Sequence, residues 1–200
     1  MENPWNERYS NSEYIYGKEP NQFFSKCLSS LSPGKILFLG EGEGRNSVYA
    51  AKSGWNVDAV DYSSAAKEKA LNLAKEENVS INYIVKDFSD FQPEENIYDV
   101  VVLVFIHLPE DLRKRTHELA IKALKPGGSI ILEAFEKEQI NYSSGGPKSL
   151  DLLYSLEEIF TDFQDLDLTT FEKAVSELNE GEKHLGTAHT IRFFGKKPTN

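Results

Sequence analysis

Cysteine is almost missing from this chain of 200 residues, because Cys27 is the only one. A disulfide framework needs at least two cysteines, so the class of small disulfide-rich folds is excluded. The histidines form no ligand pair with Cys27 at the spacing of a zinc site. We therefore expect no metal and no disulfide, and a lone thiol is typical of a cytoplasmic protein.

Long apolar runs and a basic region are missing as well. No stretch is long enough to span a bilayer, and the polar N-terminus lacks the pattern of a signal peptide, so we expect no membrane contact. The formal net charge is -10, and no basic cluster beyond Lys196 and Lys197 offsets it. Such a surface repels polyanions, which argues against a nucleic-acid partner.

The chain does contain enough apolar sequence for one core. Hydrophobic residues make up 40% of it, and no linker-like stretch divides it, so we expect one domain over residues 1–200. Short apolar segments alternate with amphipathic ones, which predicts an α/β fold. Strands are expected at residues 36–39, 55–60, 81–85, 98–104, 129–134, 166–171 and 188–194, while residues 172–178 leave helix and strand open.

The most informative stretch follows the first expected strand. Gly40, Gly42 and Gly44 alternate with Glu41 and Glu43, and a helix is expected directly afterwards, at residues 45–52. Such glycines let the backbone approach a ligand, which the free N–H groups of the new helix then face. The dinucleotide fingerprint fits poorly, and the two carboxylates would repel a pyrophosphate. A cationic ligand such as S-adenosylmethionine fits better, although a nucleotide and a purely structural turn stay open.

Acidic and aromatic residues follow the next strands. Asp61, with Tyr62 after it, ends the second strand, where a carboxylate can accept hydrogen bonds from a ribose; its alternative role is a charge at the next helix start. Asp87 and Phe88 follow the third strand and can hold an adenine between them. Phe105 follows the fourth. Because the carboxyl ends of parallel strands share one edge, we expect one site there.

Aromatic side chains also crowd the N-terminal arm, residues 1–31. Trp5, Tyr9, Tyr14 and Tyr16 are mixed with polar residues and follow no clean period. We expect either a packing arm laid over the domain or a lid whose rings line the acceptor site and cover the cofactor.

Several short motifs resemble the class I S-adenosylmethionine-dependent methyltransferases, and more narrowly the tellurite-resistance and thiopurine-methyltransferase-like group. They are YGKEPN at 16–21, EGEGRN at 41–46, IHLP at 106–109, KPGG at 125–128, GGPK at 145–148 and EKHLG at 182–186. The resemblance implies a Rossmann-like, doubly wound sheet of seven strands, mostly parallel, with an antiparallel last strand near 188–194.

The resemblance also implies roles for individual residues. Phe38 stands where the class usually has an acidic residue, so Glu41 becomes the expected partner of the ammonium. The resemblance places Gly40, Glu41 and Gly42 at the methionine moiety, Asp61 at the ribose, and Asp87 with Phe88 at the adenine. The full set of expected cofactor-binding residues is Gly40, Glu41, Gly42, Gly44, Asn46, Asp61, Tyr62, Asp87, Phe88 and Phe105. If the arm is a lid, Trp5, Tyr9 and Tyr16 are the expected substrate-binding residues.

The expected activity is methyl transfer to a small nucleophile such as a thiol or a metalloid oxyanion, with S-adenosylhomocysteine as product and no metal. A thiolate can attack without a base. An alcohol or amine would need His107, His184 or Tyr16, although His107 has the alternative of bonding a backbone carbonyl. Leu185 follows His184 where relatives often have an arginine. A module that binds the cofactor without turnover and a nucleotide-linked oxidoreductase are the competing hypotheses.

Overall fold

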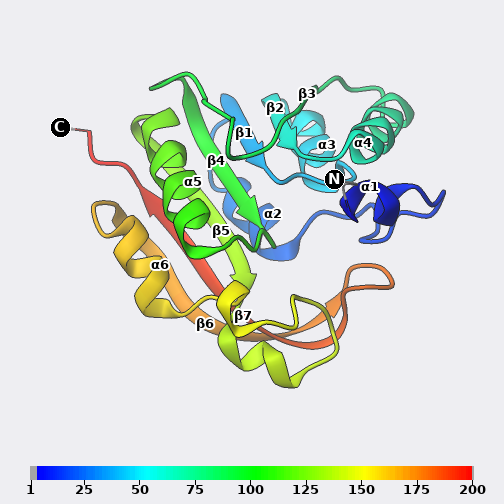
Figure 1. The fold of residues 1–200 in the computed structure, drawn as a ribbon. Coiled ribbons are helices and arrows are strands. Elements are labelled where there is room, and N and C mark those ends of the chain that lie inside the picture. Colours follow the sequence, from blue (N-terminus) through cyan, green and yellow to red (C-terminus); the bar gives the residue numbers. More distant parts are fainter. Residues whose placement is uncertain (1–3, 200) are drawn as a thin grey trace.

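The computed structural model describes residues 4–199 and contains a seven-stranded sheet with helices on both faces (Figure 1). The strand order is β3-β2-β1-β4-β5-β7-β6. β1 to β5 pair in parallel, whereas β7 runs antiparallel to β5 and β6, which confirms the predicted fold class. The strands are β1 Lys35–Leu39, β2 Asn56–Asp61, β3 Asn82–Val85, β4 Tyr98–Val104, β5 Leu124–Phe135, β6 Asp167–Asn179 and β7 Leu185–Lys196.

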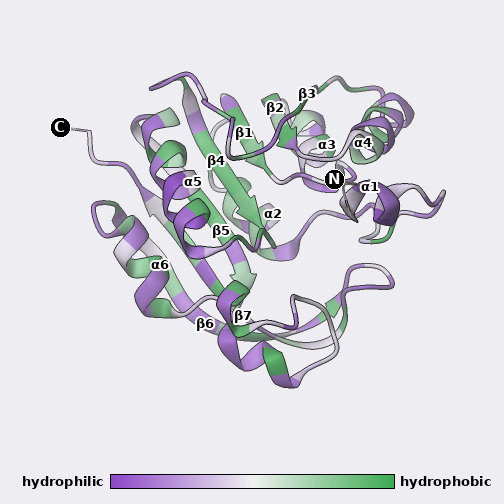
Figure 2. Cartoon of the chain, viewed as in Figure 1, coloured by the Kyte–Doolittle hydropathy of each residue, from purple (hydrophilic) through white to green (hydrophobic). Residues whose placement is uncertain are grey.

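The helices divide between the two faces of the sheet. Residues at alternate positions of the central strands enter opposite cores, so that Leu37 packs on the side of α5 and α6 and Phe38 on the side of α2 and α3. Figure 2 shows β1 and β4 as apolar, as expected for strands buried on both faces. The helices are α1 Pro4–Tyr9, α2 Gln22–Leu28, α3 Arg45–Lys52, α4 Ser64–Glu76, α5 Glu110–Ala123 and α6 Leu156–Phe163, with short 3-10 helices at Lys137–Asn141 and Leu150–Leu152.

Local sequence signals predict several elements closely. The expected helix at 45–52 is α3. Ser155 and Glu158 form the expected capping box at the start of α6, with the Glu158 amide 3.2 Å from Ser155 Oγ and the Ser155 amide 2.7 Å from Glu158 Oε2. The last hairpin differs, since residues 172–178 belong to β6 and β7 already begins at Leu185. Pairing between β6 and β7 adds backbone hydrogen bonds that no local pattern encodes.

The N-terminal arm packs against α4, while its residues 1–3 lie outside the described part of the chain. Asn6 Oδ1 accepts hydrogen bonds from Ser63 Oγ at 2.6 Å and from the Ala65 amide at 3.3 Å. The Tyr14 hydroxyl donates to the Lys69 carbonyl at 3.0 Å, and Tyr9 is buried. Within residues 4–199, no helix has the length and apolar character needed to cross a bilayer.

Candidate active site

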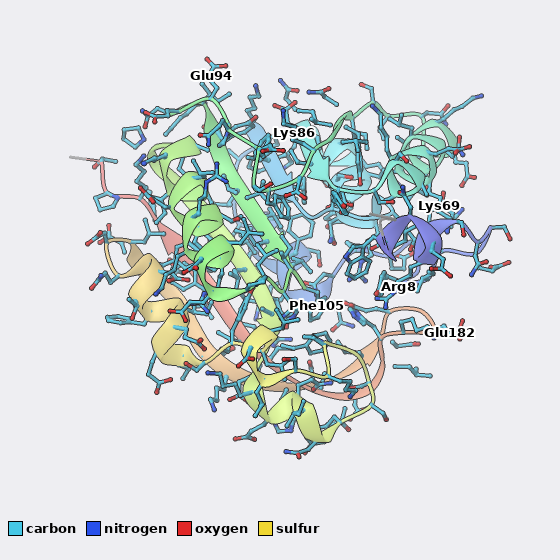
Figure 3. All side chains as sticks on the ribbon, in the orientation of Figure 1. Arg8, Lys69, Lys86, Glu94, Phe105 and Glu182 are labelled. Atoms are coloured by element: carbon cyan, nitrogen blue, oxygen red, sulfur yellow. The ribbon has the colours of Figure 1, made fainter. Side chains whose placement is uncertain are left out.

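A cavity lies at the carboxyl ends of β1, β2 and β4, between the N-terminal arm and the loop that joins β6 to β7. Figure 3 labels Phe105 at the end of β4, Arg8 on α1 and Glu182 in that loop. Gly44 and Asp87 were predicted to bind the cofactor but do not line the cavity. The predicted residues that do line it are Trp5, Tyr9, Tyr16, Gly40, Glu41, Gly42, Asn46, Asp61, Tyr62, Phe88, Phe105, His107 and His184.

The glycine loop turns sharply between β1 and α3. Gly40 and Gly42 both have φ 65°, and Gly44 has φ 95°, in the region that favours glycine. A Cβ at Gly40 would lie 2.7 Å from Ile106 Cγ1, so this backbone must stay bare beside the cavity. A Cβ at Gly44 would lie 2.7 Å from Ala70 Cα. Gly44 therefore allows α3 and α4 to pack closely.

The two glutamates of the loop have different environments. Glu41 is buried, and its Oε1 accepts a hydrogen bond from the Ser47 amide at 2.6 Å, which satisfies the start of α3. Burial raises the pKa of Glu41 to about 7. Glu43 instead forms an ion pair with Lys69, with 2.6 Å between Oε1 and Nζ. Of these two glutamates, Glu41 is therefore the one whose carboxyl group lies beside the cavity without a lysine partner.

Asp61 holds the glycine loop against β2. Its Oδ2 accepts a hydrogen bond from the Gly42 amide at 2.9 Å, and its Oδ1 accepts one from the Ser63 amide at 2.9 Å. Burial raises the pKa of this carboxyl, and the two amide bonds oppose that shift. The Tyr83 hydroxyl donates to the Gly42 carbonyl at 2.7 Å, a contact that the sequence did not predict.

The two histidines of the cavity differ in what their ring nitrogens contact. His107 Nδ1 lies 2.7 Å from the Leu152 carbonyl, and its Nε2 accepts from the Phe135 amide at 3.2 Å. Burial lowers the pKa of His107 to about 4. This geometry favours a histidine satisfied by the backbone over a catalytic base. His184 Nδ1 instead lies 3.3 Å from Glu180 Oε2.

Aromatic rings surround His184. Its ring centroid lies 4.5 Å from that of Tyr16, 4.6 Å from that of Phe105 and 5.3 Å from that of Phe135. Phe105 has φ 54°, a conformation that is unusual for a bulky residue and clusters at functional sites. Trp5 stacks on Tyr9 at 5.7 Å at the arm side of the cavity.

Comparison of the sequence with known protein families finds one that matches part of this chain. Residues 36–128, from β1 to the start of β5, match the family described as a methyltransferase domain. The comparison thus identifies residues 36–128 as similar to a methyltransferase domain, the kind of protein that the sequence motifs indicate. The glycine loop, Asp61 and Phe88 all fall within the matched residues, whereas the arm and the β6–β7 loop fall outside them.

Two further proteins and one solved structure are similar to this chain. Ubiquinone biosynthesis O-methyltransferase of Rickettsia akari is 31% identical over 134 residues, covering 66% of this chain and 51% of the relative, so the chain spans about half the length of that relative. Thiopurine S-methyltransferase of Legionella pneumophila (strain Corby) is 27% identical over 207 residues, covering 91% and 90%. The solved structure of TehB from Haemophilus influenzae aligns with a TM-score of 0.74 at 18% identity, covering 96% and 65%. The predicted resemblance to this group is confirmed.

One further group of polar side chains lies outside the cavity of this methyltransferase domain. Glu136, Glu138 and His189 bring ligand atoms within 4.8 Å of one another. Lys173 Nζ lies 2.5 Å from Glu136 Oε1 and 3.9 Å from Glu138 Oε1, and His189 Nδ1 lies 3.3 Å from Glu138 Oε2, so both carboxylates already have partners. The group is explained by ion pairing.

Six lining residues were not predicted as site residues: Gly17, Glu43, Arg45, Val104, Ile106 and Leu108. Arg45 was expected only as the first residue of a helix, yet its guanidinium is buried beside the cavity. Its partner Glu180 lies 135 positions away in the sequence. The one available signal was a charged residue inside the EGEGRN motif.

Proposed function

We propose that this protein transfers a methyl group from S-adenosylmethionine to a small, uncharged or weakly acidic nucleophile. The observation that carries the proposal is one cavity in which the glycine loop, three buried carboxylates (Glu41, Glu43 and Asp61) and aromatic rings from the arm meet. The alternative is a module that binds the cofactor without turnover, and it predicts the same binding with no product.

The residues present fit the cofactor. A Cβ at Gly40 or Gly42 would come within 2.7 Å of Ile106 or 3.0 Å of the Tyr9 hydroxyl, so both positions require glycine where the loop lines the cavity. We assign Glu41 to the ammonium, Asp61 to the ribose and Phe88 to the adenine. Asp61 still has lone pairs available, since each carboxylate oxygen accepts more than one hydrogen bond.

The bound cofactor supplies a methyl carbon already activated by its sulfonium. The chain then has to position the acceptor and exclude water. The rings of Trp5, Tyr9 and Tyr16 are assigned to this role, and each aromatic face near a sulfonium adds about 0.5–2 kcal/mol of cation–π attraction. His184 is assigned as the group that takes a proton from an acceptor that carries one.

The charges of the lining favour an uncharged acceptor over an oxyanion. Among the described residues that line the cavity, Arg45 is the only arginine, and none is a lysine. Its Nη2 already forms an ion pair with Glu180 Oε2 at 2.8 Å. Leu185, which stands where relatives often have an arginine, is 62% exposed. Glu41 and Asp61 remain as carboxylates near the cavity, and like charges repel an incoming anion.

The proposal is tested by incubating the protein with S-adenosylmethionine and one of three acceptors: benzyl mercaptan, selenite or benzylamine. S-adenosylhomocysteine and the methylated product are then measured by mass spectrometry. We expect the thiol to react fastest and selenite slowest. Calorimetry should give binding of S-adenosylhomocysteine and none of NADH. Binding without any product would support the non-catalytic module, and tight NADH binding alone would overturn the cofactor assignment.

A further inference from the structure

A buried ion pair connects the glycine loop to the β6–β7 loop. Arg45 Nη2 lies 2.8 Å from Glu180 Oε2, and the two side chains are 7% and 9% exposed. Arg45 Nη1 also donates to the Tyr16 carbonyl at 3.2 Å, which adds the arm to the same junction. Because desolvating two charges offsets most of their attraction, such a pair is weak evidence for stability and calls for another explanation.

Glu180 also contacts His184, which lines the cavity. The same oxygen, Oε2, lies 3.3 Å from His184 Nδ1. Backbone bonds fix the loop between them, since the Glu180 amide donates to the His184 carbonyl at 2.9 Å and the His184 amide to the Gly181 carbonyl at 3.3 Å. A carboxylate at Nδ1 selects the tautomer with the proton on that nitrogen, which leaves a lone pair on Nε2.

Other contacts hold Glu180 and its loop in place. Asn21 Nδ2 donates to Glu180 Oε1 at 3.3 Å and to Glu133 Oε2 at 2.6 Å. Gly181 has φ 82°, and a Cβ there would lie 2.3 Å from the Ile15 carbonyl oxygen, so the loop packs directly on the arm. The charged and titratable groups that face His184 are therefore Glu180, Arg45, Glu133, His107 and Tyr16.

We propose that Glu180 is a positioning residue for His184, and that Arg45 holds Glu180 in place so that His184 Nε2 can take a proton from the acceptor. This inference rests on the proposed function. For a thiol, the S–H proton passes to Nε2 while the acceptor sulfur bonds the methyl carbon and the bond from that carbon to the donor sulfur breaks. The products are a methyl thioether, neutral S-adenosylhomocysteine and a protonated His184, which releases its proton to water.

The two partners of this ion pair act on His184 in opposite directions. Burial lowers the pKa of His184, the hydrogen bond that His184 donates to Glu180 raises it, and the charge of Arg45 lowers it. Glu180→Gln should therefore move the acid limb of the rate profile to lower pH, and Arg45→Gln should move it to higher pH. With benzyl mercaptan as acceptor, we expect Glu180→Gln to reduce kcat roughly tenfold or more, with an unchanged KM for the cofactor.

Nitrogen-15 NMR of histidine-labelled protein reads the tautomer and pKa of His184 without any turnover. We expect the Nδ1–H tautomer in the unmodified protein and a loss of that preference in Glu180→Ala. The double variant Arg45→Gln with Glu180→Gln removes both buried charges, and so separates a folding defect from a positioning defect.

Glu182→Gln is the matched control, because it removes the same charge from the same loop at a side chain that is 85% exposed. In Glu182→Gln, the tautomer and the pKa of His184 and the pH dependence of the rate should equal those in the unmodified protein. If Glu180→Gln and Glu180→Ala behave like Glu182→Gln, the positioning role is wrong even in an active enzyme. If no acceptor is methylated, the proposed function fails, and the NMR measurement still decides whether Glu180 fixes His184.

Discussion

The two halves of the cavity are built in different ways. The half that we assign to the cofactor, the cofactor half, comprises the glycine loop, Asp61 and Phe88, and lies on consecutive β-α units within residues 36–88. The half that we assign to the acceptor, the acceptor half, combines the arm, Phe105, His107 and His184, which come from distant parts of the chain. Figure 1 shows the arm with α1 and the β6–β7 loop on the same side of the molecule. Local sequence spacing therefore predicts the residues of the cofactor half, whereas the acceptor half forms only when distant segments pack together.

The halves also differ in how burial changes their ionisable groups. In the cofactor half, burial raises the pKa of Glu41 to about 7 and also raises that of Asp61. In the acceptor half, burial lowers the pKa of His107 to about 4 and also lowers that of His184. Each shift favours the neutral form, but the two kinds of group respond oppositely to pH.

The free energy of unfolding should therefore depend on pH in opposite ways through His107 and through Glu41. For His107 the unfolded chain binds more protons between pH 6.5 and about 4, so stability is full above pH 6.5 and falls as the pH falls, by up to about 3 kcal/mol. For Glu41 the folded chain binds more protons between pH 4.5 and about 7, so its contribution is lost as the pH rises through that range.

Urea denaturation at pH 4.5, 6 and 8 separates the two effects. Because the two pH ranges overlap between pH 4.5 and 6.5, the two contributions oppose each other there in the unmodified protein. Glu41→Gln should leave a stability that rises with pH over this range, and His107→Asn should leave a stability that falls with pH. Both variants are compared with the unmodified protein at each pH. Identical pH profiles for all three proteins would contradict the difference between the halves.

How well the sequence predicts each half follows from the same contrast. The glycine loop, α3 and the α6 capping box depend on neighbours a few positions apart, and local patterns predict them. The contact between Arg45 and Glu180 depends on the pairing of β6 with β7 and on the arm, so no local pattern encodes it. Gly44 was predicted to bind the cofactor because its spacing matches that of Gly40 and Gly42. The spacing alone does not distinguish a glycine that approaches a ligand from one that lets α3 pack on α4, as Gly44 does.

The second prediction concerns the arm. Tyr9 and Ile15 belong to a small cluster with Ala66, while the two main cores contain no described residue before Phe23. Deleting residues 1–16 should therefore leave a folded domain that still binds S-adenosylhomocysteine, though more weakly. Methyl transfer to benzyl mercaptan should fall about a hundredfold, because the acceptor loses one wall of its site.

Calorimetry and rate measurements on the same preparation check this prediction. Full activity in the truncated protein would reduce the arm to a packing element without a role in transfer. An unfolded product would instead assign its aromatic rings to the core, and the lid interpretation would be wrong.

The smallest effect is expected at Asp61, where the cofactor half can be tested alone. Asp61→Ala removes the acceptor of the Gly42 and Ser63 amides, each 2.9 Å away, together with the assigned bonds to the ribose. Charge-assisted bonds of this kind are together worth about 1.5–3 kcal/mol, so the Kd for S-adenosylhomocysteine should rise roughly ten- to hundredfold. Asp61→Asn should have a smaller effect, since an amide oxygen keeps one acceptor. Calorimetry gives the Kd, and circular dichroism checks that both variants fold. Because Asp61 lies in the cofactor half, neither variant should shift the pH dependence of the rate that we assign to His184. An unchanged Kd for S-adenosylhomocysteine in folded Asp61→Ala would show that Asp61 does not bind the cofactor.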